Sequence, residues 1–127
     1  MTEEDGVRAK GSQWQAANFD PTPRSVRDAR RFVASLVTQP EMRETGELLV
    51  SELTTNALRH AGGPFEVRVQ ATPRLRVEVR DRSRRRPAVK DPDATDEGGR
   101  GLHIVGELAR AWGTEDLADG KVVWFEL

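Results

Sequence analysis

The stretch Ser51-Glu-Leu-Thr-Thr-Asn-Ala-Leu-Arg-His-Ala61 carries the most informative pattern in this chain. Its residues Glu52, Asn56 and His60 recur every four positions, so on an α-helix they lie along one face. A carboxylate, a carboxamide and an imidazole in one stripe suit the handling of a hydrated metal ion or a phosphate. Taken alone, the same pattern also fits an amphipathic helix with a solvated polar side.

The residues around this stretch predict the other elements. A short strand is predicted at residues 14–19, and helices are predicted at residues 22–37 and 42–60, separated by Gln39-Pro40. Gly62-Gly63-Pro64 closes the second helix. Alternating apolar and polar residues then indicate a hairpin with strands at residues 65–70 and 75–80.

The last third of the chain predicts a loop, a helix and a second hairpin. Residues 82–97 are almost free of apolar side chains and are expected to form a loop. Gly101 is expected to open a helix that runs to about Trp112, and two final strands meet around Asp119-Gly120. This order of elements predicts an α+β two-layer sandwich, with a mostly antiparallel sheet and helices on one face.

Length and composition limit the classes of protein that fit. The chain has 127 residues, enough for one domain with a buried core. Its net charge of −1 does not indicate a nucleic-acid binder, and the absence of cysteine excludes disulfides and thiolate metal sites. We expect residues 1–12 to be a disordered leader, residues 13–127 to form the domain, and the protein to be cytoplasmic with no membrane-spanning segment.

Two later motifs add to the polar stripe. The strand-like residues 75–80 run into Asp81, and Gly98-Gly-Arg-Gly101 follows some residues later. With the segment at residues 21–33 and the closing Gly120-Lys-Val-Val-Trp124, these motifs resemble the anti-sigma-factor serine/threonine kinases, in their actinobacterial form. That family is a branch of the GHKL (histidine-kinase-like) ATPase superfamily, and the likeness runs from about residue 19 to residue 127.

The resemblance implies the Bergerat ATPase fold, ATP and Mg²⁺ as ligands, and a role for each motif. By this likeness Asn56 supplies an oxygen to Mg²⁺, and Glu52 is the general base. Asp81 accepts a hydrogen bond from the exocyclic amine of adenine. His60 helps to position the phosphates, although a helix-terminal histidine bonded to a carbonyl fits the sequence equally well.

The glycine-rich segment resembles the second glycine motif of that family. Glycines allow close backbone approach, and the helix that follows offers free N–H groups to phosphate oxygens. We therefore expect Gly99, Arg100, Gly101 and Leu102 to contact the nucleotide, with residues 82–97 as a lid. The arginine run that opens the lid is interpreted as solvated surface and is given no site role.

Two positions depart from the family pattern. Ser83 stands where many relatives have glycine, and Val122 is expected to occupy the place of a threonine beside Asp81. A lost hydrogen bond is worth about 1 kcal/mol, so nucleotide binding should be weakened but not abolished. Trp112 and Trp124 are interpreted as core or sheet-face residues.

We therefore predict an ATP-binding regulatory protein that resembles anti-sigma-factor serine kinases. Such a protein transfers the γ-phosphate of Mg-ATP to a serine of an antagonist protein and sequesters a sigma factor. Two alternatives stay open: a non-catalytic module whose partner choice responds to the nucleotide, and a scaffold that binds no nucleotide. The presence of Glu52, Asn56, Asp81 and Gly101 disfavours the scaffold. A homodimer is implied by the resemblance alone, and neither membrane nor nucleic acid is expected as a partner.

Overall fold

The structure, a computed structural model, describes residues 13–82 and 97–127, except for the side chains of residues 61 and 97–100. The elements in chain order are β1 (Gln15–Phe19), α1 (Pro23–Ala34), α2 (Pro40–Ala61), β2 (Phe65–Gln70), β3 (Arg76–Asp81), α3 (Glu97–Leu108), β4 (Ala111–Leu117) and β5 (Gly120–Glu126). The predicted leader at residues 1–12 and most of the predicted lid, residues 83–96, lie outside the described residues.

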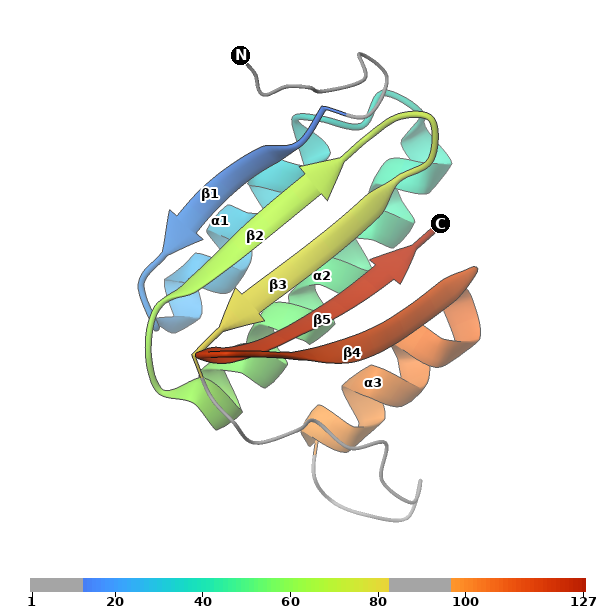
Figure 1. Cartoon of the computed structure of the whole chain (residues 1–127). Helices are drawn as coiled ribbons and strands as arrows, with labels where there is room; N and C mark the ends of the chain where they lie inside the picture. Colours follow the sequence, from blue (N-terminus) through green and yellow to red (C-terminus); the bar gives the residue numbers. More distant parts are fainter. Residues whose placement is uncertain (1–12, 83–96) are drawn as a thin grey trace.

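The strands form one sheet in the order β1-β2-β3-β5-β4, and each neighbouring pair is antiparallel. Figure 1 shows α1, α2 and α3 on one face of this sheet, while the opposite face carries no helix of the described residues. The predicted α+β two-layer sandwich with an antiparallel sheet is therefore confirmed. The chain reaches β5 from β3 through α3 and β4, so α3 lies over the β4–β5 side of the sheet.

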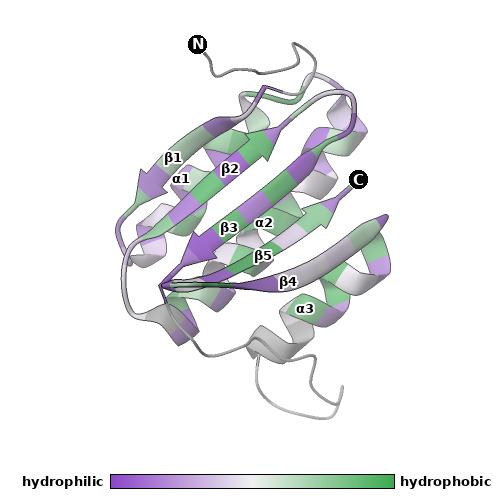
Figure 2. Cartoon of the chain, viewed as in Figure 1, coloured by the Kyte–Doolittle hydropathy of each residue, from purple (hydrophilic) through white to green (hydrophobic). Residues whose placement is uncertain are grey.

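The core lies between the sheet and the helices. Side chains alternate between the faces of a strand, and the register places Val67, Val79 and Val123 side by side on the helix-covered face, where all three are buried. Leu49 and Leu53 of α2 pack against this layer. Figure 2 shows the resulting alternation of hydrophobic and hydrophilic residues along β2 and β3.

The helix ends follow local chemistry, partly as predicted. Gly62 ends α2 in the left-handed conformation, with φ 68°, which the sequence predicted as the closing glycine. Pro40 was predicted to lie between the two helices. It instead occupies the first turn of α2, where a missing N–H removes no helical hydrogen bond. Within the described ranges, no helix is both long and apolar enough to cross a membrane.

The predicted boundaries of the third helix were wrong at both ends. The helix α3 begins at Glu97, so the glycine segment forms its first turn instead of preceding it. It ends at Leu108, and Trp112 lies in β4, opposite Phe125 of β5. The sequence interpretation missed this because glycines have poor helix propensity, which packing against α2 overrides here.

Candidate functional site

The polar stripe of α2 faces the interior of the sandwich instead of solvent. The side chain of Asn56 is 2% exposed, whereas Glu52 and His60 are half-buried, one turn to each side of it. Apolar contacts from Leu53 and Ala57 hold this part of α2 in the core. The alternative of a helix with a solvated polar side is therefore wrong, because a solvated amide would not be buried to this extent.

Asn56 has an unusual hydrogen-bonding state. Its Oδ1 is buried and has no hydrogen-bond partner among the described residues. A buried acceptor without a partner costs about 1–3 kcal/mol, so most proteins avoid one. The oxygen is available to a ligand that seeks oxygen donors, and Mg²⁺ is such a ligand because it takes one or two protein oxygens and completes its shell with water and phosphate. The residues present therefore fit the metal that the resemblance implies.

The glycine turn of α3 lies directly against the stripe. A Cβ built on Gly101 would lie 2.5 Å from Oε1 of Glu52, so any larger residue here would displace that carboxylate from its present position. Leu102 is buried in the core and anchors the helix. Gly99 and Arg100 belong to the first turn of α3, where free N–H groups can bind anions, and their side chains lie outside the described part of the chain.

Asp81 ends β3 on the helix-covered face, where it is paired with a residue that the sequence interpretation did not single out. The Nζ of Lys121 donates to both Oδ1 and Oδ2 of Asp81, each at 3.0 Å. The two residues are direct partners across β3 and β5, and each side chain is 2% exposed. Asp81 is thus the acceptor of a buried, two-contact ion pair.

The register also corrects the expectation for Val122. This residue is the partner of Arg80, so its side chain lies on the face of the sheet opposite Asp81. Lys121 occupies the position beside Asp81 that was expected for Val122. A signal in the sequence could have found it: Val123 and Phe125 face the core, and alternation along β5 then requires Lys121 to face inward too.

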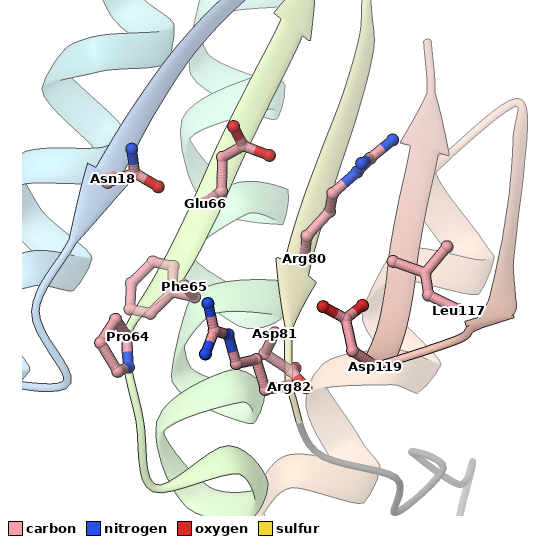
Figure 3. Close-up of a pocket in the computed structure, with 9 residues that line it drawn as sticks. All are labelled: Asn18, Pro64, Phe65, Glu66, Arg80, Asp81, Arg82, Leu117 and Asp119. Carbon is pink, nitrogen blue, oxygen red and sulfur yellow. The ribbon is translucent and has the colours of Figure 1, made fainter.

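A pocket of about 430 Å³ lies at the end of the sheet where β3 finishes at Asp81 (Figure 3). It is lined by Asn18, Pro64, Phe65, Glu66, Arg80, Asp81, Arg82, Leu117 and Asp119. Glu66 and Arg80 project from the face turned away from the helices. Asp81 lines this pocket and also belongs to the predicted site, whereas neither Glu52 nor Asn56 lines the pocket. We therefore place the candidate site between α2, α3 and the inner face of the sheet.

The open face of the sheet carries an ion-pair network centred on Glu78. This carboxylate accepts hydrogen bonds from Arg68 at 3.4 Å and Arg76 at 3.1 Å, and Arg76 also donates to Glu126 at 2.8 Å. Burial opposes the charge of Arg76, but its hydrogen bonds to Glu126 and Glu78 outweigh that effect and raise its pKa above the ordinary value. The guanidinium of Arg76 also lies 4.0 Å from the ring centroid of Trp124, which is a sheet-face residue as predicted.

Comparison with known protein families identifies the family of this chain. Residues 19–127 match the family model of the histidine kinase-like ATPase domain. The chain belongs to this family. The match spans Glu52, Asn56, Asp81 and the glycine turn of α3, so all candidate residues of this histidine kinase-like ATPase domain lie within it. No curated protein matches the chain significantly. Membership in the family indicates ATP binding, which the sequence predicted.

Proposed function

We propose that this histidine kinase-like ATPase domain is a regulatory protein that binds Mg-ATP between α2, α3 and the sheet and transfers the γ-phosphate to a serine of a partner protein. The observation that carries the proposal is the buried Oδ1 of Asn56, which has no hydrogen-bond partner in residues 13–82 and 97–127. Keeping such an oxygen in a core costs free energy, and binding of Mg-ATP would offset that cost.

Each residue of the site has a distinct task in this proposal. Asn56 would hold the metal through its amide oxygen, and bound Mg²⁺ would supply charge neutralisation to the phosphates. Glu52 lies one turn earlier and half-buried, next to the first turn of α3, where a carboxylate can take the proton of an attacking hydroxyl. The N–H groups of that turn bind phosphate oxygens, and His60 lies one turn beyond Asn56 as a positioning residue.

Asp81 marks the base end of the proposed site. It terminates β3 on the inner face, and its carboxylate suits the exocyclic amine of adenine. The resemblance to anti-sigma-factor kinases supports two partners: a sigma factor that the protein sequesters, and an antagonist protein that receives the phosphate. Exchange of ATP for ADP is expected to change which partner is recovered with the protein from cell extracts.

The experiment that tests catalysis uses Glu52→Ala. As a general base, Glu52 contributes about two to four orders of magnitude to phosphoryl transfer or background ATP hydrolysis, so the variant should lose that activity. Its Mg-ATP affinity should stay within about threefold of the wild type, because the proposed base does not hold the nucleotide. Glu44→Ala, at an exposed position two turns earlier on α2, is the matched control and should change neither quantity.

Two results would contradict this assignment. Joint loss of binding and transfer in Glu52→Ala would mean that the carboxylate orders the site against Gly101 instead of acting as a base. A wild type that binds Mg-ATP but transfers no phosphate to any serine-bearing partner would establish the non-catalytic, nucleotide-dependent binding module instead.

A further inference from the structure

The ion pair between Lys121 and Asp81 lies where the base of the nucleotide is proposed to bind. The ammonium of Lys121 contacts both carboxylate oxygens of Asp81 at 3.0 Å, and both side chains are 2% exposed. A carboxylate recognises adenine by accepting an N–H hydrogen bond from the exocyclic amine. Lys121 already supplies N–H donors of the same kind to the same atoms.

We propose that Lys121 is an internal competitor of the adenine amine and thereby sets the affinity and base selectivity of the site. The inference rests on the proposed function, because it assumes that a nucleotide base approaches Asp81. In the described structure, the ammonium of Lys121 donates hydrogen bonds to both carboxylate oxygens of Asp81. A bound adenine can use Asp81 fully only when at least one of these contacts is given up.

The fold prevents the pair from separating by movement of the strands. Asp81 and Lys121 are cross-strand partners in the antiparallel β3–β5 ladder. At the start of β5, Gly120 lies so close to β3 that a Cβ there would overlap the carbonyl oxygen of Asp81. The exchange therefore has to occur in the side chains. An ammonium that leaves its carboxylate inside the core loses its compensating charge, so the exchange is costly.

This competition has a chemical signature that a merely structural ion pair lacks. While Lys121 occupies Asp81, the amine of adenine contributes little to binding. ATP and purine riboside 5′-triphosphate, which lacks only that amine, should then bind the wild type within about threefold of each other. When Lys121 is replaced, the ammonium no longer competes for the carboxylate of Asp81, and the preference for ATP should rise.

The test is a calorimetric titration of the full chain with these two Mg-nucleotides. In Lys121→Thr, we expect ATP to bind at least about tenfold more tightly than in the wild type, because a hydrogen bond to a charged group is recovered. The preference for ATP over purine riboside triphosphate should also grow at least about tenfold. Arg74→Thr, an exposed change just before β3 at the end of that strand away from Asp81, is the control for lost positive charge and should leave the preference unchanged.

A second variant covers the case in which Lys121→Thr does not fold. The amide of Lys121→Gln can still donate one neutral hydrogen bond to Asp81, so a smaller rise in the ATP preference is expected. A preference that stays constant or falls in the folded variants would overturn the inference while leaving the proposed function intact, provided that the wild type binds Mg-ATP. If neither nucleotide binds the wild type or any variant, both the inference and the proposed function are wrong.

Discussion

Breaking the buried ion pair from one side should destabilise the protein strongly, and replacing both partners should not. Asp81→Leu leaves the ammonium of Lys121 in the core, and Lys121→Met leaves the carboxylate there, because each side chain is 2% exposed and the two contacts are 3.0 Å long. Loss of one partner of such a pair costs about 3–5 kcal/mol. Since domains of this size are stable by about 5–15 kcal/mol, either single variant should lose a large share of its stability.

The double variant provides the decisive comparison. An apolar pair of similar volume is neutral to stabilising relative to a buried ion pair, so Asp81→Leu with Lys121→Met should recover most of the loss. Urea unfolding followed by tryptophan fluorescence and circular dichroism gives all free energies of unfolding for this cycle. An exposed pair serves as the control: Glu107→Gln removes the partner of His103, where the side chains are 47% and 66% exposed, and should change stability by less than about 0.5 kcal/mol.

Single variants that lose less than about 1 kcal/mol of unfolding free energy, the range of exposed pairs, would show that no uncompensated charge is buried. Equal instability of the double variant and the singles would also contradict the expectation, because the cost would then come from lost packing and not from an uncompensated charge.

Three other substitutions follow from the same geometry. Gly120→Ala should destabilise the protein by at least about 2 kcal/mol in urea unfolding, because its Cβ would overlap the backbone of Asp81, which cannot yield like a flexible side chain. Gly101→Ala should change stability by less than about 1 kcal/mol, since alanine favours the helix, yet it should slow ATP turnover at least about tenfold by displacing the carboxylate of Glu52. Asn56→Leu should raise the melting temperature of the nucleotide-free protein, because it removes a buried acceptor that has no partner in the described part of the chain.

The expectation for Gly101→Ala has a matched control, and each of the three expectations has a contrary outcome. Gly106→Ala makes the same change on α3, where the new Cβ would lie 3.2 Å from Nε1 of Trp112, and should leave turnover intact. Wild-type turnover in Gly101→Ala would show that the carboxylate of Glu52 has no role at its present place. Wild-type stability in Gly120→Ala would show that the packing at this glycine is looser than described. A lower melting temperature in Asn56→Leu would show that the amide stabilises the nucleotide-free protein.

The sequence predicted those parts of the fold that depend on local patterns. The four-residue spacing of Glu52, Asn56 and His60 placed them on one helix, and the alternation at residues 65–80 predicted the first hairpin. Gly62 ended α2 as expected because its left-handed backbone suits glycine. These features depend on neighbouring residues, so a single sequence contains enough information to predict them.

The sequence interpretation failed where contacts between distant segments override local preference. The glycine turn was expected to precede a helix, but it forms the first turn of α3, which packs against α2. Lys121 was overlooked because a lysine on a strand is expected in solvent, and its burial depends on a carboxylate 40 residues earlier in the chain. That Oδ1 of Asn56 meets no partner among the residues the structure describes is likewise a property of the folded core, which spacing alone cannot predict.

The most direct test of the central claim is a calorimetric titration of ATP into the wild type and Asn56→Leu, each with and without Mg²⁺. If Asn56 holds the metal of Mg-ATP, the wild type should bind ATP at least about tenfold more tightly with Mg²⁺ than without it, whereas the variant should show no such difference. Binding without Mg²⁺ should be similar in both proteins. An equal response to Mg²⁺ in the two proteins, or no binding of ATP by the wild type at millimolar concentration, would contradict the account.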